Sequence, residues 1–447
     1  MELPFVCPLD WRYGSEEMRR LFTLDAMVRR LVEVEKAIYL GLVEAGIAPR
    51  SCLEVVEKCF SVDPREVYEL EKRIGHDVAS LTYILGERCG ECGNYVHLGA
   101  TSYDVVDTAW ALAIRDALAI IKERLRRVVK LLEDAARRYI DLVMVGRTHG
   151  QHALPITLGF KFANYVYELS RSYERLCCAE ERVAKGKVSG AVGTMAGWMG
   201  RGLAVEAAVS RALGLPMHEI STQVAPRDGF AELVAALAIL GSSLDRLALE
   251  VRELSRPEIH EVVEVHGGVG SSTMPHKMNP VIAERVSGLA KVLRGLVITA
   301  LENVPLMHER DLTNSSSERI LIPHALLVAD QMLIDCERML RSLRIDEDAI
   351  DRNLKLSRGW NMVECIMVKL VEKGVPRHEA HRHLAKLARE LSGERSALEA
   401  LSSDPLVSQK LSPEEIRWCL EPRNYLGNYR ELVERALSYA ERALSRC

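Results

Sequence analysis

The sequence contains few aromatic residues. They make up 5% of its 447 residues, whereas hydrophobic residues as a whole make up 48%. The core must therefore be built mainly from Ala, Leu, Val and Ile, which suits packed helices. Alternating strand patterns are almost absent as well, so we expect an all-α fold.

The chain also lacks an excess of basic charge and a long apolar run. Its formal net charge is −4, so we expect no nucleic-acid partner. The longest apolar run, around residues 233–240, is far shorter than the roughly 18 residues that a membrane span needs. The N-terminus has no basic segment followed by an apolar stretch, as a secretion signal would have. We therefore expect a cytoplasmic protein with no membrane partner.

Amide residues are scarce, whereas cysteines are abundant. The chain has nine Asn and four Gln, but eleven Cys. Scarcity of thermolabile amides is typical of thermophiles, and intracellular proteins of hyperthermophiles can be rich in disulfides. Cys89 and Cys92 form a single CxxC, without the second pair that a zinc site would need. We hypothesise that some cysteines form structural disulfides, with buried inert thiols as the alternative. The odd count leaves at least one cysteine without an intrachain partner.

Apolar residues recur at steps of three or four over several long segments. Residues 103–145 contain no Pro or Gly and predict a helix of roughly 60 Å, at 1.5 Å per residue. Similar patterns cover residues 157–185, 228–254, 280–301 and 317–343. Five long helices indicate one elongated bundle. Stripes such as residues 230–247 are apolar enough to predict burial against other subunits.

Shorter helical patterns lie on either side of these five. We predict an N-terminal helical domain at residues 1–95, the long-helix bundle at 96–345 and a C-terminal helical domain at 346–447. The expected C-terminal helices cover residues 346–353, 361–373, 377–391 and 414–420.

Two motifs combine groups that transfer protons with groups that bind anions. In HLGATSYDVVDT, residues 97–108, Thr101 and Ser102 open the first long helix, and Asp104 stands where a capping box would place it. An ordinary helix cap explains that motif equally well by itself. In GRTHGQH, residues 146–152, His149 lies in a turn between two long helices. A lone histidine in a turn is more often structural.

The third motif, GGVGSSTMPHKMNP at residues 267–280, is the most informative. Its glycines free the backbone, and Pro280 suits the first position of a helix that Asn279 precedes. The N-terminus of that helix would attract anions, so we expect a lid that closes over a carboxylate or phosphate substrate. A plain Gly/Ser loop explains the glycines, but not the clustering of Ser271, Lys277 and Asn279.

This third motif resembles the signature of the fumarase, aspartase and argininosuccinate lyase superfamily. The other two motifs resemble further signature segments of that superfamily, in the same order. The resemblance implies a homotetramer with five long helices per subunit and active sites shared between three subunits. It also implies a small-molecule substrate and no metal or redox cofactor.

Within the superfamily, segments along nearly the whole chain resemble the adenylosuccinate lyases. This implies β-elimination of fumarate from adenylosuccinate, giving AMP, and from SAICAR, giving AICAR, in purine biosynthesis. By resemblance, His76 orients His149 or binds phosphate. The HEAHRH segment at residues 378–383 departs from the family, and there we favour an exposed basic helix face over a metal site. The implied substrate-binding residues are Arg12, Tyr13, Asp77, Thr101, Ser102, Thr148, Gln223, Ser272, Met274, Asn279, Arg285, Arg310, Ser315 and Arg319.

Fumarate elimination requires an acid for the leaving nitrogen, a base for the proton beside a carboxylate, and stabilisation of the resulting carbanion. Histidine titrates near neutrality, and by resemblance His149 is the acid. The resemblance assigns Ser271 as the base, with Ser272 as the adjacent alternative. A serine base needs a positive, water-poor site, which Lys277 would help to supply. Lys277 and Asn279 would stabilise the carboxylate and the developing charge.

The sequence leaves three alternatives to fumarate elimination from adenylosuccinate. The 3-carboxymuconate lactonising enzymes have a very similar lid, but their substrate has no phosphate for the predicted arginines to hold. Another fumarate-releasing lyase of the superfamily is a further alternative. A non-catalytic scaffold protein is the alternative from a different class. Retention of the acid, the base and both lid residues together argues against that scaffold.

Overall fold

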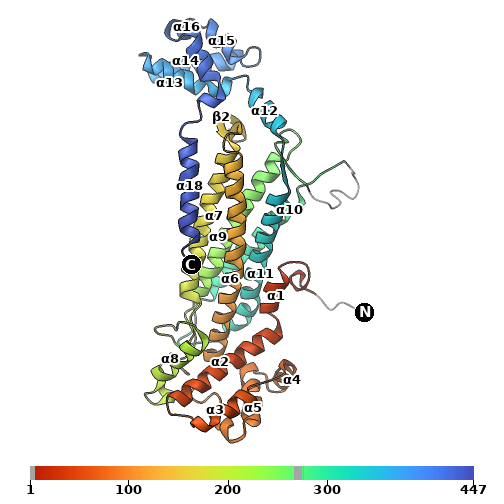
Figure 1. Ribbon diagram of the computed structural model, residues 1–447, viewed down its shortest axis with the longest axis vertical. Helices are drawn as coiled ribbons and strands as arrows, with labels where there is room; N and C mark the ends of the chain where they lie inside the picture. The colour runs from red at the N-terminus through yellow and green to blue at the C-terminus, as the bar shows by residue number, and fades with distance from the viewer. Residues whose placement is uncertain (1–5, 266–273, 275) are drawn as a thin grey trace.

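The computed structural model describes residues 6–265, 274 and 276–447, and it confirms the all-α fold class. Long helices lie side by side as an elongated bundle, with smaller helical regions at its two ends (Figure 1). The bundle helices are α6 (Ser102–Arg138), α7 (Leu158–Val183), α9 (Asp228–Leu254), α10 (Val281–Glu302) and α11 (Thr313–Ser342). One continuous apolar core joins all five. No helix within the described ranges is both long and apolar enough to cross a membrane.

The prediction that the first long helix extends to residue 145 is wrong. Helix α6 ends at Arg138, and residues 143–157 form an antiparallel hairpin of β1 (Val143–Thr148) and β2 (Gln151–Thr157). The helix pattern breaks there because Gly146, Gly150 and Pro155 follow within this stretch, and glycine and proline are poor helix formers. A second small sheet pairs β3 (Val262–Glu264) with β4 (Leu343–Ile345), which joins the segment after α9 to the end of α11.

The N-terminal region forms a second apolar core at one end of the bundle. Its helices are α1 (Glu16–Leu21), α2 (Leu24–Glu44), α3 (Leu53–Cys59), α4 (Pro64–Ile74) and α5 (Asp77–Arg88). The later helix α8 (Gly202–Leu213) packs against α2, because Gly41 lets the two backbones approach closely. Apolar residues of α6 and of residues 188–215 also belong to this N-terminal core.

The C-terminal region forms a third apolar core at the opposite end (Figure 1). It contains α13 (Val363–Glu372), α14 (Arg377–Leu391), α15 (Ala397–Ser403), α16 (Pro405–Lys410) and α17 (Pro413–Leu420). Helix α12 (Glu347–Leu356) connects it to the bundle. The last helix, α18 (Tyr429–Leu444), returns along α7 and places Val433, Leu437 and Ala440 in the bundle core. The three predicted domain ranges stay a prediction. Helix α18 lies in the predicted C-terminal range but packs against the bundle.

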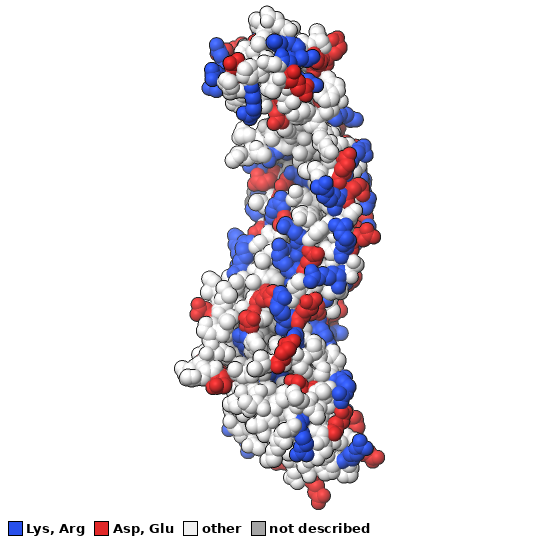
Figure 2. All heavy atoms as spheres, turned by 90° about the vertical axis from the view of Figure 1, so that its left-hand side faces the viewer, with Lys and Arg blue, Asp and Glu red and all other residues white. Residues whose placement is uncertain are grey.

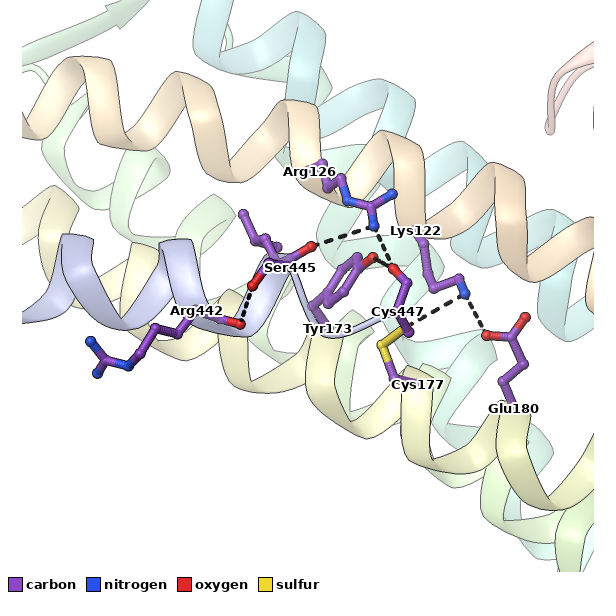
Figure 3. The surroundings of a disulfide bond; sticks show 9 residues. Lys122, Arg126, Tyr173, Cys177, Glu180, Arg442, Ser445 and Cys447 are labelled. Atoms are coloured by element: carbon purple, nitrogen blue, oxygen red, sulfur yellow. Dashed lines mark hydrogen bonds and ion pairs between the residues drawn. A yellow bond between two sulfur atoms is a disulfide. The ribbon is translucent and has the colours of Figure 1, made fainter.

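The hypothesis that some cysteines form disulfides is confirmed. Cys52–Cys92 and Cys59–Cys89 lie in the N-terminal region, and Cys365–Cys419 joins α13 to α17. The fourth disulfide, Cys177–Cys447, ties the segment after α18 to α7 (Figure 3). There the carbonyl oxygen of Cys447 accepts hydrogen bonds from Tyr173 Oη at 2.7 Å and Arg126 Nη2 at 2.6 Å. Free thiols remain at Cys7, Cys178 and Cys336.

Candidate active-site segments

The segment that opens α6 is fixed by one buried carboxylate. Asp104 accepts the N–H of Thr101 at 2.7 Å, as a capping residue would. The same carboxylate accepts the N–H groups of Ser189 at 2.8 Å and Gly190 at 3.1 Å, and it pairs with the buried ammonium of Lys187. Asp104 therefore does more than cap a helix. It attaches the start of α6, with Thr101 and Ser102, to the loop that follows α7.

His76 lies beside this segment. It precedes α5, and its Nδ1 accepts the N–H of Ala79 at 3.3 Å, so a neutral ring carries its proton on Nε2. That Nε2 lies 3.4 Å from Ser102 Oγ. The imidazole is half exposed. The structure thus brings His76 and Ser102 together, although 26 residues separate them in sequence.

Two predicted arginines are close to the same place. Arg319, on α11, pairs with Asp77 at 2.8 Å. Arg310 donates to Gln223 Oε1 at 2.9 Å, and its guanidinium lies 3.8 Å from the centre of the Tyr103 ring. Tyr103 follows Ser102 directly, so this contact joins Arg310 to the start of α6, whereas Arg319 is joined to Asp77, the residue after His76. Ser315 lies half-buried in the first turn of α11.

A buried ion-pair network holds the helices under these groups. Arg227 donates to both carboxylate oxygens of Asp107, on α6, and to Glu318, on α11. All three side chains are buried. Burial raises the pKa of Glu318, and the charge of Arg227 opposes that shift. Since breaking a buried pair is far more costly than breaking a surface pair, the network fixes α6 against α11.

His149 occupies the tip of the β1–β2 hairpin. Its φ of 52° and that of 72° at Gly150 place both residues in the left-handed region. Thr148 and His149 are exposed. A left-handed histidine is unusual, and such backbone strain is often stored at functional sites. The interpretation of this motif as a plain turn between helices is replaced by a hairpin that presents His149 to solvent.

The hairpin is held at its base by Arg147. Its guanidinium donates to both oxygens of Glu261, at 2.9 and 2.6 Å, and Glu261 is fully buried. Asn353 donates to the same carboxylate at 2.8 Å. Nearby, His152 Nδ1 lies 2.8 Å from Ser357 Oγ, and burial together with the charge of Arg147 lowers the pKa of His152. His149 therefore sits on a rigid support.

The third motif is described only in part. Ser271 and Ser272 lie outside the described residues, so their assigned roles stay predictions. Met274 and Lys277 are exposed, Asn279 is half-buried, and the Lys277 N–H donates to the Met274 carbonyl at 3.0 Å. Helix α10 begins at Val281, so the expectation that Pro280 takes its first position is wrong by one residue: Pro280 is the N-cap.

The expectation that the N-terminus of α10 would attract a substrate anion is also wrong. The buried carboxylate of Glu264 already accepts the N–H groups of Ile282, at 2.9 Å, and Ala283, at 3.0 Å. Val281 and Glu284 donate to the carbonyls of Asn279 and Pro280. Every main-chain N–H of this first turn thus has an acceptor within the protein.

Arg12 and Tyr13 lie apart from His76 and the residues around it. The next residues, Gly14 and Ser15, donate their N–H groups to Gln331 and Asp330 of α11. Arg285, on α10, pairs with the buried carboxylate of Asp335, which raises the pKa of Arg285. The phenol of Tyr13 is close enough to Arg285 to contribute to that shift.

The predicted site residues therefore form separate groups on one chain. Ser102 opens α6, whereas His149 lies beyond its other end. The 37 residues of α6 span about 55 Å at 1.5 Å per residue. Figure 1 likewise shows α5 and the β1–β2 hairpin at opposite ends of the bundle. One chain alone does not bring His76 and His149 to a common substrate.

Sequence reasoning missed Glu261 and Glu264. A signal was present, since two acids flank the apolar pair Val262–Val263 just before the glycine-rich motif. Charged residues are seldom buried unless they are paired, so acids at the ends of an apolar strand indicate specific partners.

The HEAHRH segment lies on α14. His378 and His381 are exposed, which agrees with the favoured helix face, but His383 is half-buried and lies 2.9 Å from both oxygens of Asp404. Among the described residues, no group of three or more His, Cys, Asp or Glu side chains is arranged to hold a metal ion. His383 therefore joins α14 to the N-terminus of α16.

Comparisons with known proteins agree with these motifs. The sequence profile of the family described as "Lyase" matches residues 15–295, and that described as "Adenylosuccinate lyase C-terminus" matches residues 359–436. Adenylosuccinate lyase of Pyrococcus abyssi is 43% identical over 442 residues, which cover 98% of both chains. Adenylosuccinate lyase of Archaeoglobus fulgidus is 41% identical, over 98% of this chain and 99% of its own.

Solved structures with other names share the fold. The fumarate lyase of Mesorhizobium sp. BNC1 has a TM-score of 0.87 and 32% identity, covering 95% of this chain and 98% of its own. The 3-carboxy-cis,cis-muconate lactonizing enzyme of Pseudomonas putida has a TM-score of 0.87 and 30% identity, covering 98% and 99%.

Proposed function

The chain belongs to the adenylosuccinate lyase family, and from this premise we propose that it cleaves adenylosuccinate to fumarate and AMP. We extend the proposal to the related cleavage of SAICAR to fumarate and AICAR. The observation that carries it is the identity of about 40% to curated adenylosuccinate lyases over nearly the full length of both chains. Residues 359–436 also match the profile described as "Adenylosuccinate lyase C-terminus".

The proposed acid is His149. Its exposed place at a hairpin tip and its support through Arg147 and Glu261 suit a group that meets substrate from outside its own bundle. It would protonate the leaving nitrogen. The proposed base is Ser271, with Ser272 as the alternative, and Lys277 would stabilise the carboxylate that flanks the reacting carbon.

The spacing along α6 supports the proposal that active sites are shared between subunits. His76 and His149 are separated by the length of this helix, so a site that contains both must take them from different chains. Exposed apolar side chains on α10 and around α11 support self-association, since Ile298, Leu301, Leu312 and Ile320 are each more than half exposed. We assign the assembly as a homotetramer on the family's pattern.

The separate arginine groups suit a substrate with a phosphate. Arg12, Tyr13 and Arg285 would hold it in one group, and Arg310, Ser315 and Arg319 would contribute from the other. The Arg319–Asp77 pair is solvent-exposed on the arginine side, and such pairs contribute little stability. A doubly charged phosphate can therefore replace Asp77 as the partner of Arg319.

We infer a cytoplasmic protein from a thermophile. The scarcity of amides and the four disulfides support a hot environment. Figure 2 shows acidic and basic side chains interleaved along the side of the bundle where α18 lies. Interleaved charge of both signs suits a soluble enzyme of small molecules better than a nucleic-acid surface.

The direct test mixes the purified protein with adenylosuccinate and follows the ultraviolet absorbance while fumarate and AMP are assayed. Equal amounts of both products support the proposal. Absence of products over a range of temperatures up to near boiling would overturn it in favour of the lactonising reaction, which the 30% identity to the Pseudomonas putida enzyme makes the second candidate. AMP should also raise the melting temperature, because binding to the native state stabilises it.

A further inference from the structure

Two buried carboxylates flank the strand β3. One belongs to the residue directly before the strand, and the other belongs to its last residue. Glu261, directly before β3, holds the His149 hairpin through Arg147, as described above. Glu264, the last residue of β3, is 2% exposed and accepts two N–H groups from α10. Pairing with β4 and the hydrogen bond from Val265 N–H to the Ser342 carbonyl fix the strand itself. A rigid strand thus positions the Glu264 carboxylate.

Glu264 caps the N-terminus of α10, although it lies far from that helix in the sequence. One oxygen of Glu264 accepts from Ile282 at 2.9 Å, and the other accepts from Ala283 at 3.0 Å. Eighteen residues separate Glu264 from Ile282. Pro280, at the N-cap, has no hydroxyl or carboxylate with which to make this cap. Glu264 therefore supplies from a remote strand what the helix lacks locally.

This arrangement decides where substrate charge can be held. A helix N-terminus is a ready-made anion site, and here the protein's own carboxylate fills it. A substrate carboxylate would have to displace a buried, doubly hydrogen-bonded glutamate. A substrate carboxylate beside this helix end must therefore be met by side chains that precede the helix, such as the exposed Lys277.

We propose that Glu264 is a positioning residue of the elimination reaction. Its carboxylate fixes the first turn of α10, and with it the Lys277–Asn279 segment, and it keeps the helix N-terminus closed to anions. This rests on the proposed function, in which Lys277 and Asn279 act on the substrate. Glu261, the buried acid directly before β3, has a different role because it binds Arg147 of the hairpin.

The test compares Glu264→Gln and Glu264→Ala with the wild type. Glutamine keeps one acceptor but directs an NH₂ group at the second N–H, and alanine removes both acceptors. We expect kcat for adenylosuccinate to fall about 10- to 100-fold, because small displacements of positioned groups are costly. We expect KM to change by less than about threefold. The matched control is Asp63→Asn, which makes the same acid-to-amide change at the exposed cap of α4 and should leave kcat unchanged.

Acetate rescue separates this role from general stabilisation. In Glu264→Ala, acetate can enter the vacated position at the N-terminus of α10, so added acetate should restore part of kcat in a saturable way, while chloride should not. Fumarate should also inhibit this variant more strongly than the wild type, because the helix end is then open to anions. All assays are made well below the melting temperature of each variant.

A measurement that does not depend on enzyme activity tests the role of Glu264 separately from the choice of substrate. Amide hydrogen exchange at Ile282 and Ala283 should accelerate at least tenfold in Glu264→Gln relative to the wild type, since their acceptor is weakened. Unchanged exchange, or an unchanged kcat in both folded variants, would overturn the positioning role. A wild-type enzyme that fails to cleave adenylosuccinate while exchange responds as expected would overturn the proposed function only, and not the cap.

Discussion

Nδ1 of His97 lies 2.6 Å from Oε1 of Glu35, so that an ion pair joins the segment before α6 to helix α2. The Glu35 side chain is fully buried, and His97 has a φ of 60°, in the left-handed region. Two residues later, Gly99 passes so close to Trp198 that an added Cβ would lie 2.6 Å from the indole nitrogen. These contacts fix the path of the chain into Thr101 and Ser102.

This pair predicts a dependence of stability on pH. Burial lowers the pKa of His97, but the charge and hydrogen bond of Glu35 outweigh it, and the pKa is raised overall. A raised folded-state pKa stabilises the protein fully below the unfolded value of about 6.5, and that contribution is lost as the pH rises through the folded value. The free energy of unfolding, measured with denaturant, should therefore fall from pH 6 to pH 9.

The control for that prediction is His97→Asn, because asparagine tolerates the left-handed backbone. It should flatten this part of the pH profile. An equally steep fall in the variant would assign the dependence to other groups.

Replacement of His149 should remove catalysis without unfolding the protein. General acids typically contribute about 10²–10⁴-fold, so His149→Asn should lower kcat by at least about 100-fold. Asparagine suits the φ of 52°, and the residue is exposed, so the melting temperature should change little. A loss of less than about tenfold in kcat would reject the acid role.

Substitution of the two adjacent serines should identify the base. Ser271→Ala should abolish turnover while AMP still raises the melting temperature, because a base is needed for chemistry rather than for binding. Ser272→Ala should keep measurable turnover. The reverse pattern would assign the base to Ser272, and weakened AMP binding with intact chemistry would contradict a base role for either.

Two inactive variants should restore activity when their subunits are mixed. His76→Ala and His149→Ala lose different groups, which lie at opposite ends of one bundle. If each site takes the two histidines from different chains, random mixing of subunits leaves roughly a quarter of the sites intact. Unfolding and refolding the two variants together tests this, with each variant refolded alone as the control. Recovery at the level of the separate controls would place both histidines on one chain.

Thiol titration should distinguish the paired cysteines from the free ones. The unfolded, unreduced chain should show three thiols, and the reduced chain eleven. In the native state Cys336 should react slowest, because it is fully buried and burial raises the pKa of its thiol. Eleven thiols without reduction would contradict the four disulfides.

Removal of the Cys177–Cys447 disulfide should lower stability but not activity. It closes a separation of 270 residues, and loss of a disulfide typically costs about 2–5 kcal/mol. Cys177→Ser should therefore lower the melting temperature, while kcat measured well below that temperature should match the wild type. A lowered kcat would show that the attachment of α18 to α7 matters for the site.

Much of the helical architecture could be predicted because apolar spacing is a local property. The range 228–254 agrees with α9, and 377–391 agrees with α14. The prediction failed for residues 139–145, which were assigned to the first long helix, although the apolar run at residues 142–145 fits a strand as well. The domain range that contains residues 429–444 stays a prediction. Helix α18 itself packs along α7, through apolar contacts between residues far apart in the chain.

Of the site, the sequence alone determined the kinds of chemistry present and their order along the chain: Ser102 and His149 in their motifs, and Lys277 and Asn279 before a helix. Only the tertiary structure decided how they are held. The Glu35–His97, Arg147–Glu261 and Glu264–α10 contacts join residues far apart in the chain. Hydrogen bonds between buried groups depend on where the folded backbone places those groups. Local sequence patterns do not specify the distances between residues that are far apart in the chain.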